Sequence, residues 1–163
     1  MNRRNWLALA AALIGVGVLA AWPAQAQGVV KVGVLEAMTG QQQSTGKQTL
    51  AAMRLYMQQH GDTVAGKKIE LVVKDDAAVP ENTKRLAQEL IVRDKVNFLV
   101  GFAITPTALA VAPLATEAKV PLIVANAGTS IITERSPYIT RTSFTLPQSS
   151  TIIAEWALKN GVK

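Results

Sequence analysis

The sequence predicts an α/β fold in which a parallel sheet carries helices on both faces. Two observations lead to this prediction. Short runs rich in β-branched residues alternate with segments whose apolar residues recur at helical spacing, and glycine or proline separates most of these segments. Strands and helices that alternate in this way form parallel sheets joined by right-handed crossovers.

The first half of the chain contains two predicted strands, each followed by a helix. Residues 29–35 form a valine-rich run, and a helix follows from Gly46 to about His60, with Gly61 suited to end it. Residues 69–73 give the second strand. The next helix begins at Pro80, where proline loses no hydrogen bond, and runs to about Lys95.

The second half repeats the alternation with shorter elements. Residues 96–100 form the third strand, and a helix with a face of small residues runs from Thr105 to Ala118, with a kink expected at Pro113. Residues 122–124 are the fourth strand, and residues 138–142 resemble a strand weakly. A last helix ends near Gly161, and its apolar face consists of Ile152, Ile153, Trp156 and Ala157.

The first 26 residues read as a signal peptide. Arg3 and Arg4 precede an apolar run from Trp6 to Ala21, and Ala24-Gln25-Ala26 supplies small residues for cleavage. The run is shorter than the roughly 20 residues that span a bilayer, so cleavage before Gln27 is favoured over retention as an anchor. The arginine pair also suits twin-arginine export, but it opens many ordinary Sec signals. We therefore expect export by the Sec pathway to a periplasm.

Charge and composition exclude several classes of function. The net charge of +6 falls to +4 without residues 1–26, and no block of five like charges occurs, so nucleic acid is not an expected partner. No later segment is long enough to span a membrane. The absence of cysteine excludes disulfides, thiolate metal sites and a cysteine nucleophile, so the stability of the fold must come from packing.

Three features that suggest enzymatic chemistry are better explained otherwise. Residues 40–47 resemble a phosphate-binding loop, but five residues separate the glycines instead of four, and Gln48 replaces the hydroxyl residue. We expect one of Asp75 and Asp76 to accept loop hydrogen bonds and the other to be solvated. His60 is predicted to be a surface residue at a helix end. No enzymatic activity, cofactor or metal is therefore predicted.

A recognition surface is predicted instead at the carboxyl ends of the strands, where such sheets bind ligands. Thr105 begins a helix after the third strand, and Ala127-Gly128-Thr129 follow the fourth. A helix start offers unpaired amide donors, and Gly128 would let a ligand reach the backbone, so a carboxylate would bind well. The alternative for Thr105 is simple helix capping. The loops at this edge are residues 36–46, 75–79, 101–105 and 125–129.

Taken together, these segments resemble the amino-terminal half of periplasmic binding proteins of the branched-chain amino acid type, the exported receptors of ABC importers. No single segment is decisive, but their order and spacing are specific. The matching segments are Val30 to Gly40, Lys74-Asp75-Asp76 with Pro80, Val100-Gly101 leading to Thr105, Val120-Pro121 leading to Ala127-Gly128-Thr129, and Tyr138 to Phe144.

The resemblance implies two α/β lobes that close on a small ligand. The first lobe would hold the ligand's carboxylate through Thr105, Ala127 and Thr129, with Ala103 nearby. The receptor as a whole would deliver this small carboxylate to permease subunits in the membrane. Thr45 occupies a place where amino acid receptors often carry an aromatic residue. This departure argues against leucine-like ligands and leaves aromatic acids, amides or other carboxylates.

By the same resemblance, residues 27–146 form the first lobe and residues 147–163 open a truncated second lobe. The chain ends where another strand would ordinarily begin, as expected of a fragment of a longer protein. One lobe would leave a ligand half exposed, so residues 27–163 alone are expected to bind it weakly. Two other functions remain open: the ligand-sensing domain of a signalling protein, and an exported enzyme whose catalytic part lies elsewhere.

Overall fold

The computed structural model describes residues 28–162, so the predicted signal peptide lies outside the described residues. One six-stranded sheet has the order β2-β3-β1-β4-β5-β6. The strands are β1 (Val29–Glu36), β2 (Thr63–Val64), β3 (Lys67–Asp75), β4 (Phe98–Gly101), β5 (Leu122–Val124) and β6 (Ile139–Arg141). The helices are α2 (Gln43–His60), α3 (Pro80–Val92), α4 (Thr105–Ala118) and α5 (Leu146–Lys159), with a 3₁₀ helix η1 (Ser130–Glu134).

The sheet is parallel apart from one short edge strand. β1 lies in the centre, where Val34 pairs with Val73 of β3 and Val100 of β4. β2 runs antiparallel to β3. The sequence prediction began the second strand at residue 69 and missed β2. Ala65 and Gly66 between the two strands have φ angles of 50° and 73°, the left-handed pair that closes a tight hairpin.

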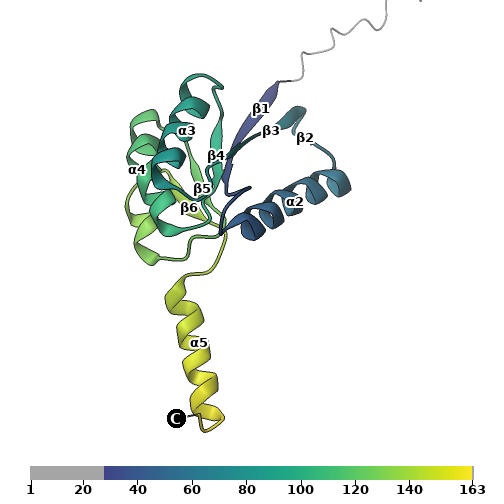
Figure 1. Ribbon diagram of the computed structural model, residues 1–163. Coiled ribbons are helices and arrows are strands. Elements are labelled where there is room, and N and C mark those ends of the chain that lie inside the picture. Colours follow the sequence, from purple (N-terminus) through teal and green to yellow (C-terminus); the bar gives the residue numbers. More distant parts are fainter. Residues whose placement is uncertain (1–27, 163) are drawn as a thin grey trace, which may run out of the picture.

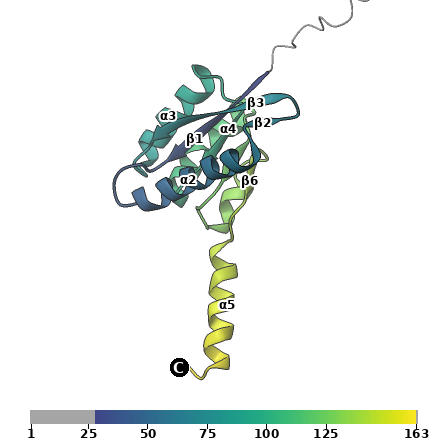
Figure 2. The same cartoon turned by 90° about the vertical axis from the view of Figure 1, so that its right-hand side faces the viewer.

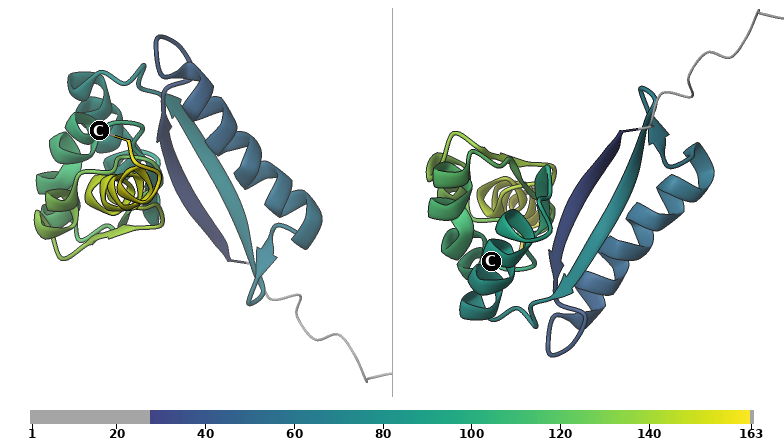
Figure 3. Two further views of the ribbon diagram at one scale, coloured as in Figure 1. Left: turned by 90° about the horizontal axis from the view of Figure 1, so that it is seen from below. Right: turned by 90° about the horizontal axis from the view of Figure 1, so that it is seen from above.

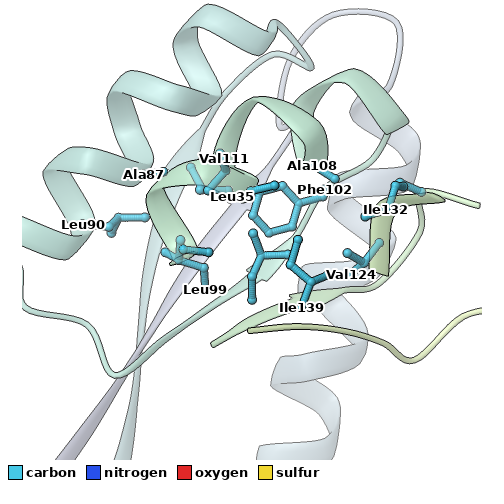
Figure 4. Packing of buried hydrophobic residues seen from close by; sticks show 14 of the residues in the cluster. Leu35, Ala87, Leu90, Leu99, Phe102, Ala108, Val111, Val124, Ile132 and Ile139 are labelled. Carbon is cyan, nitrogen blue, oxygen red and sulfur yellow. The ribbon is translucent and has the colours of Figure 1, made fainter. Parts of the chain in front are cut away.

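Helices cover both faces of the sheet, as predicted. α3 and α4 pack together on one face and α2 lies on the other (Figures 1 and 3). The larger core lies beneath α3 and α4 and includes Leu35, Leu90, Leu99, Phe102 and Val111 (Figure 4). A smaller cluster on the α2 face is built around Val32, Val34 and Val100. Alternate residues of β1 thus supply both cores, as expected of a strand buried on both sides.

Several boundaries differ from those that the sequence predicts. α2 begins three residues before Gly46, and α3 ends at Val92 instead of near Lys95. Lys95 has a φ of 53° and turns the chain, so that Val96 enters the core before β4 begins at Phe98. The boundary between α3 and β4 thus depends on a turn residue that is neither glycine nor proline.

The last helix stands away from the sheet. α5 starts near the carboxyl ends of the strands and extends from the lobe (Figures 1 and 2). Its first turn has a capping box in which Thr145 and Gln148 each accept from the other's backbone N–H. No residue of α5 is buried, and Ile152, Ile153 and Trp156 of its predicted apolar face are exposed. Among residues 28–162, no helix is long and apolar enough to cross a membrane.

Candidate ligand-binding site

The ends of β4 and β5 bring together the two threonines that the sequence singled out. Thr105 is the first residue of α4, and Thr129 lies in the loop before η1. Their Oγ1 atoms are 2.6 Å apart and form a hydrogen bond between half-buried side chains. The two hydroxyls therefore converge at one edge of the sheet, while their role toward a ligand stays a prediction.

The capping alternative for Thr105 is wrong. The residue that caps α4 is Ile104, in an extended conformation, and it provides no side-chain cap. Thr105 occupies the first helical position and directs its hydroxyl to Thr129. Thr107, two residues further on, donates its hydroxyl to the carbonyl of Ile104 at 2.7 Å. No side chain of the capping residue therefore accepts a hydrogen bond from the backbone N–H groups in the first turn of α4.

The loop that carries Thr129 is held from three sides. The amide of Ala127 donates to the carbonyl of Phe102 at 3.0 Å, which ties the loop to the one after β4. The guanidinium of Arg141 donates to the carbonyl of Thr129 at 2.5 Å. The amide of Leu146, at the start of α5, donates to the carbonyl of Gly128 at 2.8 Å. These contacts fix the loop before any ligand arrives.

The other predicted contact residues lie in the segments that follow β1, β4 and β5. Ala103 is half-buried in the loop between β4 and α4, and Thr45 is half-buried in the first turn of α2. Ala127 is 3% exposed with its side chain in the core, so only its backbone could meet a ligand. A methyl group on Gly128 would lie 3.1 Å from Leu146 Cγ. The space beside Gly128 is therefore occupied by Leu146, and the glycine serves this packing.

Sequence reasoning missed a buried carboxyl group at the same edge. Glu36, the last residue of β1, is fully buried and accepts a hydrogen bond from Asn126 Nδ2 at 3.0 Å. Burial raises the pKa of Glu36 from 4.5 to about 7; the Asn126 hydrogen bond lowers it, and the nearby Asp76 carboxylate raises it further. The sequence did carry one indication of this group, because Glu36 directly follows the apolar residues of the first predicted strand.

The aspartate pair differs from its prediction, because both side chains accept hydrogen bonds from the loops. Asp75 accepts from the amides of Met38 and Ala77 and from the Thr39 hydroxyl. Burial opposes the effect, but these hydrogen bonds hold the pKa of Asp75 below its ordinary value. The prediction left one aspartate of the pair solvated, but Asp76 is only 1% exposed. It accepts hydrogen bonds from the Ala78 amide and the Thr83 hydroxyl. Both aspartates thus organise loops.

The remaining motifs have structural roles. Gly46 lies inside α2, where a methyl group would come within 2.2 Å of the Ala37 carbonyl, so this glycine allows close packing of α2 on the chain after β1. His60 is exposed at the end of α2 and stacks on Tyr56. Within residues 28–162, no three His, Asp or Glu side chains gather in a way that could hold a metal ion.

A separate hollow of about 620 Å³ lies along α4, lined by Leu109, Pro113, Thr116 and Arg135 among others. Its lining comes from α4 and from Arg135 just after η1, and it includes none of the predicted site residues. We place the candidate site at the threonine pair instead, because in parallel α/β sheets the carboxyl ends of the strands supply the polar backbone groups that ligands need.

Comparison with known proteins identifies the family. The model of the periplasmic binding protein family matches residues 29–163. The chain belongs to this family. The Leu/Ile/Val-binding protein homolog 6 of Brucella abortus is 47% identical over 119 residues, which are 72% of this chain and 30% of the relative.

Solved structures of family members share the fold. A solute-binding protein of an ABC transporter from Rhodopseudomonas palustris BisB5, in complex with 3,4-dihydroxybenzoic acid, is 71% identical with a TM-score of 0.81; the match covers 83% of this chain and 37% of that protein. A second R. palustris solute-binding protein, with 4-hydroxybenzoate, is 45% identical with a TM-score of 0.79, covering 82% and 36%. The leucine-binding protein of Thermotoga maritima is 27% identical with a TM-score of 0.75, covering 80% and 37%.

These matches confirm the predicted resemblance and fold, the first lobe of a type I periplasmic binding protein. The chain spans about a third of the length of the relatives that it matches. The named relatives are binding proteins of ABC transporters or of amino acids. The division at residues 146 and 147 stays a prediction, although α5 begins at Leu146.

Proposed function

We propose that this chain supplies the first lobe of a periplasmic solute receptor that binds a small carboxylate and delivers it to the permease subunits of an ABC importer, without catalysing a reaction. The observation that carries the proposal is the Thr105–Thr129 hydroxyl pair at the start of α4. One of its two hydroxyl protons forms the mutual hydrogen bond, so the other is available to a ligand. A ligand carboxylate would accept hydrogen bonds from this hydroxyl and from the backbone amides of the helix start.

We further propose that the ligand is a hydroxylated benzoate and not a branched-chain amino acid. Two relatives at 71% and 45% identity were solved with dihydroxybenzoate and hydroxybenzoate, while the leucine-binding relative is 27% identical. Thr45 also supports this choice, because it stands where amino acid receptors of the resembling type often carry an aromatic residue. The predicted signal peptide, residues 1–26, supports export to the periplasm.

A thermal-shift screen of the full-length mature protein tests the ligand class. We expect 3,4-dihydroxybenzoate and 4-hydroxybenzoate to raise the melting temperature, because a ligand that binds only the folded state stabilises it by mass action. Leucine and isoleucine serve as comparison ligands. A rise with leucine and none with either benzoate would contradict the proposed ligand class, and no rise with any carboxylate would contradict the receptor function.

Removal of either hydroxyl of the pair should weaken binding. Thr105→Val or Thr129→Val deletes a hydrogen-bonding group while keeping the shape, and a hydrogen bond to a charged group contributes about 1.5 to 3 kcal/mol. We expect the dissociation constant of 4-hydroxybenzoate, measured by calorimetry, to rise roughly tenfold or more. Thr63→Val on β2 is the matched control and should leave affinity unchanged. Equal affinities in all three variants would exclude the pair from the site.

A further inference from the structure

A network of hydrogen bonds joins three segments at the carboxyl ends of the strands. Asn126 Nδ2 donates to Glu36 Oε1 at 3.0 Å and to Thr49 Oγ1 at 2.9 Å. The Thr49 hydroxyl donates in turn to the carbonyl of Thr45 at 3.0 Å. The two amide protons of Asn126 and the one hydroxyl proton of Thr49 are all used, so the direction of each bond is fixed. This hydrogen-bond network connects the end of β1, the loop after β5 and the first turns of α2.

The backbone between β1 and β5 makes this connection possible. β4 lies between the two strands, with Gly101 paired to Leu35 on one side and Val124 on the other. A methyl group on Gly101 would come within 3.1 Å of Glu36 Cγ. The absence of a side chain at this position therefore lets Glu36 extend past β4 to reach Asn126.

The surroundings of Glu36 favour its neutral form. The acidic groups facing it are Asp75, paired with it on β3, and the next residue, Asp76. β4 contributes Gly101 and α2 contributes Thr49, neither of which carries charge. Among residues 28–162, no basic side chain pairs with Glu36, and its Oε2 atom is buried without a hydrogen-bond partner. Burial of an unpaired negative charge is costly, whereas a neutral carboxyl group can still accept from Asn126.

We propose that Glu36 is a positioning residue of the candidate site, whose neutral carboxyl group holds the loop of residues 125–129 at a fixed place relative to α2 through Asn126 and Thr49. The inference rests on the proposed function, because that loop carries Thr129 and α2 carries Thr45. Ionised Glu36 would place a negative charge at the strand ends, beside an anionic ligand. Affinity for a carboxylate therefore falls as pH rises through the range in which Glu36 loses its proton.

The test compares the full-length mature protein with its Glu36→Gln variant. Calorimetry with 4-hydroxybenzoate, whose carboxyl group stays ionised throughout, is performed between about pH 6 and 8, on either side of the value of about 7 for Glu36. We expect the wild-type affinity to fall roughly threefold to tenfold over this range, as one nearby charge forms in a partly shielded site. Glutamine keeps the acceptor for Asn126 and cannot ionise, so the affinity of Glu36→Gln should stay near the wild-type value at pH 6.

Two further variants separate positioning from a general effect on folding. Glu36→Ala removes the oxygen that accepts from Asn126, so this variant should bind 4-hydroxybenzoate more weakly at every pH. Glu36→Gln should recover the affinity that Glu36→Ala loses. Glu70→Gln, at an exposed glutamate of β3, should keep the wild-type pH profile. The proposal is overturned if Glu36→Gln and the wild type show the same pH dependence, or if Glu36→Ala lowers only the melting temperature and not the affinity.

A measurement without ligand distinguishes this inference from the proposed function. If the wild type binds no benzoate at any pH, the proposed ligand class fails, and the network is tested by the side-chain amide NMR signals of Asn126. We expect these signals to move with the titration of Glu36 in the wild type and to stay constant in Glu36→Gln. Constant signals in the wild type would overturn the proposal.

Discussion

Gly101→Ala is expected to destabilise this lobe by about 2 to 5 kcal/mol, the sum of backbone strain and steric overlap. Gly101 has a φ of 131°, a conformation that residues with a side chain rarely adopt. A methyl group there would lie 2.1 Å from the carbonyl oxygen of Leu35, a residue of the central strand β1. Neither β1 nor β4 can move away easily, because both are paired on each side. Such a loss is a large share of the stability of an ordinary domain.

Urea unfolding of the wild type and two alanine variants measures this effect. Gly66→Ala is the matched control, since Gly66 also has a positive φ, of 73°, but nothing lies within 4 Å of the added methyl group. We expect Gly66→Ala to cost only about 1 to 2 kcal/mol, from strain alone. If Gly101→Ala lost no more stability than this control, the close approach of β4 to β1 would not constrain the fold.

The arrangement of the lobe followed from the sequence because its signals are local. Alternation of valine-rich runs with helical spacing is visible within a few turns of chain, and it correctly placed β1, β5 and the helices on both faces. β2 was not predicted, because a strand of two residues is too short to show the alternation of apolar and polar residues. The end of α3 and the start of β4 were predicted wrongly, because Lys95 between them adopts a left-handed conformation that lysine does not signal.

The candidate site could be predicted only in part, because its contacts are of two kinds. Thr105 and Thr129 each follow a strand, and neighbouring parallel strands end at the same edge, so topology alone brings them together. Glu36 and Asn126 lie 90 residues apart, and their hydrogen bond depends on the empty space at Gly101. A contact that depends on the absence of a third side chain leaves no periodic trace in the sequence.

Loss of the Phe102 side chain is expected to destabilise the lobe by about 3 to 5 kcal/mol, as for other aromatic residues truncated in a core. Phe102 is fully buried and lies among Leu35, Ala108 and Val124, directly after β4 (Figure 4). Its backbone accepts from Ala127, so the residue also supports the loop that carries Thr129. Phe102→Ala should therefore lower the urea midpoint and also speed hydrogen exchange at the Ala127 amide.

The matched control is Phe144→Ala, since Phe144 is 63% exposed and the same substitution there leaves no cavity. We expect it to change stability by less than about 0.5 kcal/mol and to leave exchange at Ala127 unaltered. Faster exchange at Ala127 in Phe102→Ala alone, measured under conditions in which both variants are folded, would show that the core holds the binding loop. Equal exchange in the two variants would mean that Arg141 and Leu146, which also donate to this loop, are sufficient to hold it.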